Sequence, residues 1–206
     1  MTVIALQPLD KKRTKVCLDN EETFVLYQKE LREFHIEQDA ELPGEVYHEI
    51  MRELLPKRAR LRAMHLLEVR PYTEYKLREK LRDGHYPAAI IEDAIEYVKS
   101  YGYVDDFRYA LDYATYHTQD RPKGRIRGDL IAKGIAKDVV EEALETAYEE
   151  SLSHEEQESP ERLLIQKEFR KKRFEPDTAG YEEKQKMRAY LYRKGFSTDV
   201  IAEMVD

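Results

Sequence analysis

The sequence predicts a mainly α-helical fold, in which an elongated tandem array of three three-helix repeats follows a small N-terminal β-hairpin and helix. Composition is the first observation: the 206 residues include 8 Gly, 8 Pro and no Trp, and 37% are charged, which is typical of helix-rich chains with small cores. The second observation is one residue pattern that occurs three times in the same register. Repeated helical units stack into extended surfaces, so this pattern favours a binding protein over an enzyme.

The repeated pattern is anchored at Leu81, Leu130 and Leu191, which lie 49 and then 61 residues apart, near the upper end of the periods of helical repeats. An apolar residue precedes each anchor by four positions and an arginine by three. An apolar or aromatic residue follows at five, and pairs of apolar residues follow at nine and ten and at thirteen and fourteen. The positions nearest the anchors are Leu77, Arg78 and Tyr86, then Ile126, Arg127 and Ile135, then Met187, Arg188 and Phe196.

Residues 1–55 differ from the rest of the chain and form the expected N-terminal element. Short β-prone runs begin at Val3, Val16 and Thr23, and turn-forming residues separate them, which predicts a hairpin or a three-stranded meander. Such a small sheet is not stable alone and must dock on a helix. Apolar residues between Leu26 and Phe34 predict a short helix after the last strand.

The first repeat is expected at residues 56–104. Pro56 can begin or kink its first helix, and Pro71 ends that helix. Thr73 is a favourable N-cap for the second helix, and Pro87 stands where the third helix should start.

The second and third repeats are expected at residues 105–158 and 159–206. Asp105 is an N-cap signal for the second repeat, and Ser159-Pro160-Glu161 places a cap, an N1 proline and a first-turn acid in succession. One detail differs among the repeats: Gly84 lies one position earlier in the register than Gly134 and Gly195, so we expect a different loop there.

Several stretches resemble the RecX family of regulatory proteins. They are Ala63-x-x-Leu66-Leu67-x-x-Arg70-Pro71, Lys76-Leu77-Arg78-x-Lys80-Leu81, Gly102-Tyr103-Val104-Asp105-Asp106-x-x-Tyr109-Ala110 and Lys123-Gly124-x-x-x-x-x-Leu130-x-x-Lys133-Gly134-Ile135. The resemblance is dense over about residues 63–145. It implies tandem three-helix repeats and a protein that binds the RecA–DNA filament. It also implies inhibition or modulation of recombinase, ATPase and co-protease activity in homologous recombination, DNA repair and the SOS response.

Charge is segregated along the chain although the net charge is -7. Residues 52–82, 121–137 and 162–194 carry 27 of the 35 Lys and Arg residues, whereas residues 138–161 carry ten acidic residues and no basic one. Arg can hold carboxylate or phosphate bidentately, and repeated basic helices suit a periodic, polyanionic filament. The candidate partner-binding residues are Arg58, Arg62, Arg70, Arg78, Arg82, Arg121, Lys123, Arg125, Arg127, Lys133, Arg188 and Arg193.

Two alternatives remain open for these side chains. Arg78, Arg127 and Arg188 could instead form internal ion pairs with the third helix of a repeat. A sequence-nonspecific nucleic-acid-binding module is the rival function, since the turn between the second and third helices resembles a helix-turn-helix. The acidic third helix argues against it, because it would repel phosphate. The tyrosines at 72, 75, 86, 97, 101 and 103 could stack on bases, but we expect them to fill helix interfaces.

No enzyme signature is found in the sequence. A Walker A spacing is missing around Lys123-Gly124, and the six histidines pair with no Cys, so we expect no metal, cofactor or catalytic residue. Ser151, Ser153 and His154 lie in a Glu-rich linker, a poor setting for a nucleophile. The single Cys17 fits a reducing compartment, and no apolar run is long enough to cross a membrane. We therefore expect a cytoplasmic protein, monomeric, with RecA as its partner and at most weak direct binding to single- or double-stranded DNA.

Overall fold

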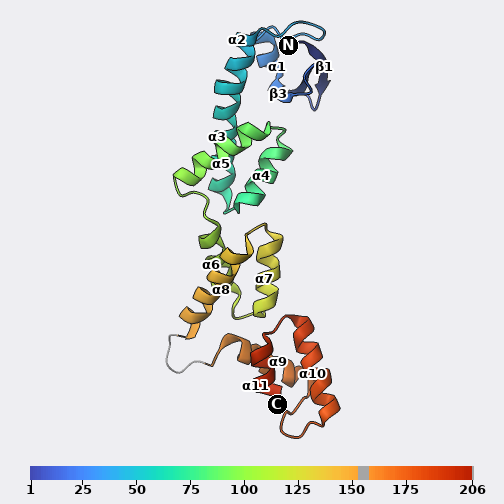
Figure 1. Ribbon diagram of the computed structural model, residues 1–206, viewed down its shortest axis with the longest axis vertical. Helices are drawn as coiled ribbons and strands as arrows, with labels where there is room; N and C mark the ends of the chain where they lie inside the picture. The colour runs from blue at the N-terminus through green and yellow to red at the C-terminus, as the bar shows by residue number, and fades with distance from the viewer. Residues whose placement is uncertain (153–157, 206) are drawn as a thin grey trace. The chain divides into compact units, whose positions relative to one another are not determined.

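The computed structural model describes residues 1–152 and 158–205. The chain divides into two compact units, Met1–Val104 and Asp105–Asp206, shown in Figure 1. Within the described residues the fold is mainly helical with a small N-terminal sheet, which confirms the predicted fold class. Ser153, His154 and part of the acidic segment 138–161 lie outside the described residues.

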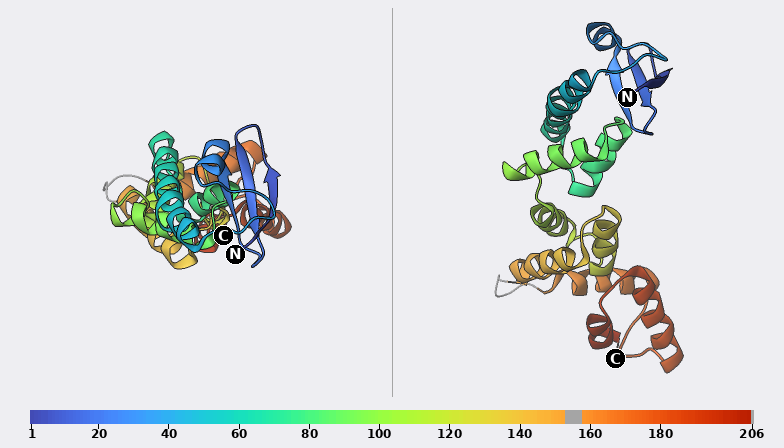
Figure 2. Two further views of the ribbon diagram at one scale, coloured as in Figure 1. Left: turned by 90° about the horizontal axis from the view of Figure 1, so that it is seen from above. Right: turned by 45° about the horizontal axis from the view of Figure 1, so that its top comes forward.

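The N-terminal sheet is a three-stranded antiparallel meander in the order β1-β2-β3. Its strands are β1 (Val3–Pro8), β2 (Arg13–Leu18) and β3 (Thr23–Tyr27). The side chains of the central strand alternate in burial: Thr14, Val16 and Leu18 are buried, because successive side chains of a strand point to opposite faces. Helix α1 (Gln28–Glu33) follows at once, and the sheet lies beside the helix that runs from Gly44 to Val69 (Figures 1 and 2).

That long helix consists of α2 (Gly44–Glu49), a π-helical turn η1 (Ile50–Leu54) and α3 (Leu55–Val69). Pro56 neither begins nor breaks it. A proline inside a helix lacks the N–H for the normal bond, and its ring collides with the carbonyl four residues back. The widened turn accommodates this, with the Leu55 N–H bonded to the Ile50 carbonyl. The boundary expected between residues 55 and 56 thus falls inside one continuous helix.

The first repeat is completed by α4 (Glu74–Asp83) and α5 (Ala88–Ser100). Thr73 caps α4 by accepting a hydrogen bond from the Lys76 N–H, as its position predicts. The other two repeats consist of α6 (Asp106–His117), α7 (Lys123–Ala132) and α8 (Lys137–Leu152), then α9 (Pro160–Lys172), α10 (Tyr181–Lys194) and α11 (Thr198–Val205). Asp105 and Ser159 cap α6 and α9 with their side chains.

Each repeat has a hydrophobic core of its own, built from the repeated pattern. The anchors Leu81, Leu130 and Leu191 are fully buried, and they fall in three separate clusters. The first cluster also includes Val16, Leu18 and other residues of the sheet. The sheet therefore docks on the first repeat, as its small size requires.

The turn after the second helix shows why Gly84 is out of register. Four residues after the anchor, Gly134 and Gly195 have positive φ angles of 84° and 94°, whereas His85 takes this place in the first repeat with φ 60°. In all three repeats this residue and the next donate N–H bonds to the end of the helix, as in a left-handed C-cap. Gly84 has a different role: a Cβ there would lie 2.9 Å from the Tyr86 ring.

Replacing His85 with glycine is expected to stabilise the protein by about 0.5–1 kcal/mol, because glycine reaches the left-handed conformation without steric cost. The measurement is chemical denaturation of the full chain followed by circular dichroism. The reciprocal change, Gly134→His, is the matched control and should destabilise by a similar amount. Equal effects of both changes in the same direction would contradict this explanation.

Candidate functional site

A groove between the second and third repeats brings four basic side chains together in the unit Asp105–Asp206. It has a volume of about 500 Å³. Its walls come from the α6–α7 connection and α7 on one side and from α9 and the end of α10 on the other. The lining residues are Asp120, Arg121, Pro122, Arg125, Leu164, Lys167, Glu168, Lys194 and Phe196.

A buried carboxylate joins the two repeats beside this groove. Glu161, in the first turn of α9, is only 3% exposed. Its Oε1 accepts hydrogen bonds from the backbone N–H of Lys123 at 3.0 Å and of Ser197 at 3.3 Å. These amides precede or begin α7 and α11, where helix N-termini leave N–H groups unsatisfied and favour negative charge. One side chain thus ties three helices of two repeats together.

A contact between two glycines completes this joint. The Gly124 N–H donates to the Gly195 carbonyl at 2.8 Å, which brings the start of α7 against the end of α10. A Cβ at Gly124 would lie 2.6 Å from that carbonyl oxygen, so only glycine fits. The sequence around Lys123-Gly124 lacks the Walker A spacing, and the structure gives Gly124 a packing role.

The cations of the groove differ in how far their charge is neutralised. Arg121 is 2.8 Å from Asp129, and Lys194 is 2.8 Å from Glu168, whose hydrogen bond raises the pKa of Lys194. Arg125 reaches the same Asp129 at 3.4 Å, but its side chain is 68% exposed. Lys167 is exposed and forms no ion pair with any described residue. Arg125 and Lys167 are therefore the groove cations best placed to meet an external anion.

In the arginine column of the repeated pattern, Arg78 and Arg127 have internal partners. Arg78 forms a bidentate pair with Glu92 at 3.0 and 2.6 Å, and Arg127 forms one with Glu141 at 2.6 and 2.9 Å. These hydrogen bonds raise the pKa of both arginines and lower the pKa of both carboxyl groups. Each pair joins the second helix to the third, as the alternative interpretation of this column expected. Arg188 is half-buried.

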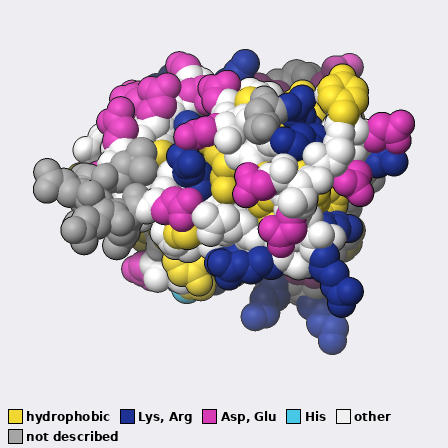
Figure 3. Space-filling view, turned by 90° about the horizontal axis from the view of Figure 1, so that it is seen from below, with side chains coloured by type: hydrophobic (Ala, Val, Ile, Leu, Met, Phe, Trp, Pro, Cys, Tyr) yellow, Lys and Arg dark blue, Asp and Glu magenta, His cyan; other side chains and the backbone are white. Residues whose placement is uncertain are grey.

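The remaining candidate residues fall into two groups. Arg58 is half-buried and bonded to Glu30, while Lys123 and Lys133 have their Nζ atoms over tyrosine rings. The second group is exposed to solvent and comprises Arg62, Arg70, Arg82 and Arg193. Basic and acidic side chains alternate in patches on the face shown in Figure 3, which agrees with such widespread local pairing.

A second basic column escaped the sequence analysis. Five positions before each anchor stand Lys76, Arg125 and Lys186. Lys76 pairs with Glu79 at 2.8 Å, and Lys186, whose side chain is 79% exposed, has Glu182 at 3.9 Å. The register contains this column, and aligning charges as well as apolar residues would have found it. Lys167 has no equivalent signal, because its place in the groove depends on how two repeats pack.

The tyrosines follow the expected interface role only in part. Tyr72, Tyr86 and Tyr97 pack against the first core. Tyr75, Tyr101 and Tyr103 are exposed. Apolar residues lie near the tyrosines of both groups in the sequence, so the sequence alone does not separate the packed tyrosines from the exposed ones.

The described residues offer no constellation for metal chemistry. No group of three or more His, Cys, Asp or Glu side chains within them could hold a metal ion. None of the helices in residues 1–152 and 158–205 combines the length and apolar character that crossing a bilayer requires. The described residues do present exposed basic side chains on a helical scaffold.

The fold and the candidate site together define a protein of tandem three-helix repeats with exposed basic side chains on its second helices. Models of the first and the third three-helix domain of RecX match residues 59–97 and 162–205. The chain belongs to the RecX family of regulatory proteins, as its sequence motifs indicated.

Similar proteins span the full chain. The regulatory protein RecX of Clostridium acetobutylicum is 29% identical over all of this chain and 94% of its own length. That of Clostridium beijerinckii is 26% identical over all of this chain and 93% of its own length. A crystal structure of regulatory protein RecX has a similar fold, with a TM-score of 0.62 at 24% identity over 99% of this chain and 98% of its own. RecX from Lactobacillus salivarius has a TM-score of 0.60 at 20% identity, over 73% of this chain and 94% of its own.

Proposed function

We propose that this protein binds the RecA–DNA filament as a cytoplasmic monomer and restrains it, so that recombinase, ATPase and co-protease activities fall. Similarity to regulatory RecX proteins over the whole chain carries the proposal. The exposed arginines on the second helices support it, because guanidinium groups bind both phosphate and carboxylate, the two anions that a nucleoprotein filament presents.

We assign only some of the candidate basic residues to the surface that contacts the filament. Arg78 and Arg127 hold the third helices through paired carboxylates, and removing one partner of such a pair costs stability. Arg82, Arg125 and Arg193 are exposed and can change without loss of the fold. They are the residues to which we assign contact with the filament.

Reversing the charge of these three residues together, as Arg82→Glu, Arg125→Glu and Arg193→Glu, is expected to weaken inhibition of RecA at least tenfold. The reason is that three attractive contacts with a polyanion become repulsive. The measurement is the ATPase rate of RecA on single-stranded DNA as the protein is titrated in. Unchanged thermal unfolding of the variant would show that the fold is intact.

The matched control reverses Arg32, Arg52 and Arg108, which are also exposed but lie outside the second helices. It changes net charge equally and should inhibit like the natural protein. Equal loss in both variants would mean that net charge acts, not this surface. No inhibition by the natural protein would refute the proposed function, and tight, salt-sensitive binding to naked duplex DNA would favour the rival function.

A further inference from the structure

A second cleft lies in the unit Met1–Val104, between the N-terminal sheet and the first repeat. Its volume is about 730 Å³, within the range of small-ligand sites. Four segments supply its walls: the β1–β2 hairpin, β3, α3, and the end of α4 with the turn that follows it. The lining residues are Asp10, Lys11, Lys12, Arg13, Val25, Tyr27, Leu55, Arg58, Arg62, Lys80, Asp83, Gly84, His85 and Tyr86.

Positive charge dominates this cleft. Six of the lining side chains are Lys or Arg and two are Asp. Lys80 has Asp83 at 3.5 Å. Lys11, Lys12 and Arg62 are exposed and form no ion pair with any of the described residues. Three cations from two separate segments therefore line a concave surface without an ion-pair partner of their own among the described residues, and this favours a polyanionic ligand.

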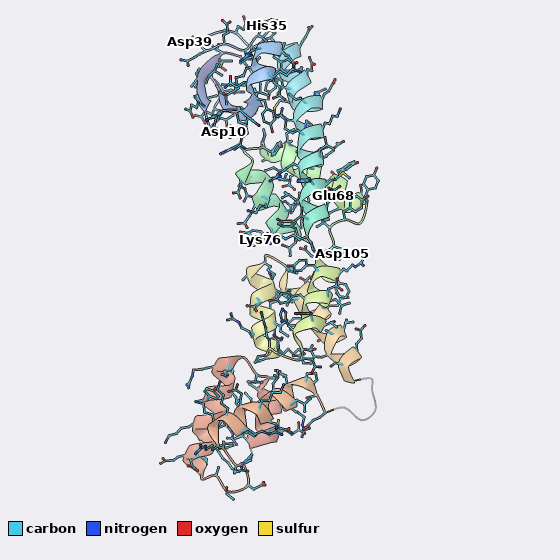
Figure 4. All side chains as sticks on the ribbon, turned by 180° about the vertical axis from the view of Figure 1, so that it is seen from behind. Asp10, His35, Asp39, Glu68, Lys76 and Asp105 are labelled. Atoms are coloured by element: carbon cyan, nitrogen blue, oxygen red, sulfur yellow. The ribbon has the colours of Figure 1, made fainter. Side chains whose placement is uncertain are left out.

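The acidic residue on the hairpin does not cancel this charge. Asp10 accepts hydrogen bonds from the backbone N–H groups of Lys12 and Arg13, both at 2.8 Å, and pairs with the Arg13 guanidinium at 2.7 Å. Those bonds lower the pKa of Asp10 to about 2. Its charge is thus committed to shaping the turn, which Figure 4 shows at the end of the sheet nearer the first repeat. The hydrogen bonds to Asp10 hold the turn that carries Lys11 and Lys12 in place without a bound ligand.

Two aromatic rings stand among these cations. Tyr27 has the Arg58 guanidinium 4.7 Å from its ring centroid. Arg58 is itself fixed by Glu30 and by the Val25 carbonyl at 3.1 Å. Tyr86 is folded over Gly84, and burial raises its pKa, so its hydroxyl stays protonated. Aromatic surface held rigidly beside free cations suits a ligand with a flat base as well as negative charge.

The turn that carries Tyr86 is strained. His85 adopts the left-handed conformation in the place where the other repeats have glycine, and such strain often marks a functional site. His85 also lines the cleft. The first repeat thus departs from the common pattern at the point where its turn meets the cleft.

The geometry points to a nucleotide-binding site in this cleft, with phosphates on Lys11, Lys12 and Arg62 and a base against Tyr27. Free nucleoside triphosphate and a short segment of single-stranded DNA share this chemistry. An acidic peptide would use the cations but leave the tyrosines without a role. The site borders α4, which carries Arg82, but its three phosphate-binding cations are not among the residues assigned to the filament, and it can be tested without RecA.

The test measures binding of two fluorescent probes to the full-length protein: a six-nucleotide oligo(dT) and an ATP analogue with a fluorophore on the ribose. We expect saturable binding, at least tenfold weaker in the variant Lys12→Glu with Arg62→Glu. Neither residue forms an ion pair with a described residue. We therefore expect the variant to keep its fold, which an unchanged thermal unfolding curve would show. The matched control, Arg32→Glu with Arg52→Glu, has the same net charge and should bind like the natural protein.

The two probes distinguish the sources of the ligand. If the oligonucleotide binds and the ATP analogue does not, the ligand of the cleft is a DNA strand. If the ATP analogue binds, the ligand is a free nucleotide. The variant Tyr27→Leu, which keeps apolar bulk without the ring, should weaken either probe at least fivefold. It should leave binding of inorganic tripolyphosphate unchanged.

Three results would overturn the assignment. The first is that neither probe binds the natural protein, and the second is that the cleft variant and the control bind the probes equally well. The third is that tripolyphosphate displaces the bound probe as well as the unlabelled nucleotide does. The last would mean that the cleft recognises phosphate alone. This assay does not contain RecA, so a failure to bind the probes would not contradict the proposed function. Likewise, a failure to inhibit RecA would not contradict the assignment of the cleft.

Discussion

Replacing Glu161 with alanine is expected to destabilise the unit Asp105–Asp206 by about 2–4 kcal/mol. The change removes the acceptor of two backbone N–H groups, those of Lys123 and Ser197, from a site where the side chain is nearly fully buried. Each buried donor left without a partner costs about 1–3 kcal/mol. Glu161 also acts electrostatically on Arg127, whose pKa it helps to raise, so that arginine would lose a nearby counter-charge.

Denaturation of the full chain followed by circular dichroism measures this loss, and amide hydrogen exchange locates it. Exchange should accelerate at Lys123 and Ser197, which lie 38 and 36 residues from Glu161. The variant Glu161→Gln keeps an oxygen acceptor and should lose less. Glu182→Ala is the matched control, because Glu182 is in the first turn of α10 but 89% exposed. Unchanged exchange at the two amides would contradict the role of the joint.

Glu161 also shows how far the sequence could predict this structure. The run Ser159-Pro160-Glu161 indicates a helix start, and α9 begins at Pro160. That signal is local, because it depends on groups within one turn. The bonds to Lys123 and Ser197 are not local. They depend on the packing of two repeats, and an acid in a first turn is equally consistent with full exposure to solvent.

The arginine column likewise shows which features of the candidate site the sequence could predict and which depend on the packing. The register identified Arg78 and Arg127 as equivalent, and they do occupy equivalent places. Their function could not be read from the register, since a repeated arginine suits either a periodic partner or a repeated internal ion pair. The structure supplies Glu92 and Glu141, each fourteen residues later. A search for paired opposite charges at that constant spacing would have predicted both ion pairs.

The π-helical turn and the cleft were beyond prediction for different reasons. Pro56 signals a perturbed helix, but whether the helix ends, kinks or widens depends on what the flanking apolar residues can bury. The cleft unites the turn after β1 with α3 and the α4–α5 turn, segments that are distant in sequence. The Lys and Arg residues of the hairpin were visible as a basic stretch, without any indication of what they would face.

Replacing Gly124 with alanine is expected to destabilise the same unit by about 2–3 kcal/mol. The new Cβ would lie 2.6 Å from the Gly195 carbonyl oxygen and 3.2 Å from its Cα. Both are backbone atoms that cannot rotate away, and overpacking of this kind costs about 1–3 kcal/mol. The hydrogen bond from the Gly124 N–H to the same carbonyl would lengthen as the two helices separate.

Gly128 provides a matched control on the same helix. A Cβ at Gly128 meets nothing within 4 Å, and alanine in a helix interior is better than glycine by about 0.5–1 kcal/mol. Gly128→Ala should therefore stabilise α7 while Gly124→Ala destabilises it, as measured by denaturation of each full-length variant. Stabilisation of equal size in both would mean that helix propensity, not the contact with Gly195, decides the outcome.

The same pair of variants tests whether the groove matters as a whole. Gly124→Ala changes no charge, yet it alters the joint that sets Arg121 and Arg125 opposite Lys167 and Lys194. If the filament binds across the groove, this variant should inhibit RecA less well than Gly128→Ala at temperatures where both are folded. If both inhibit equally, the arginines act singly, and the packing of the two repeats contributes stability without shaping the binding surface.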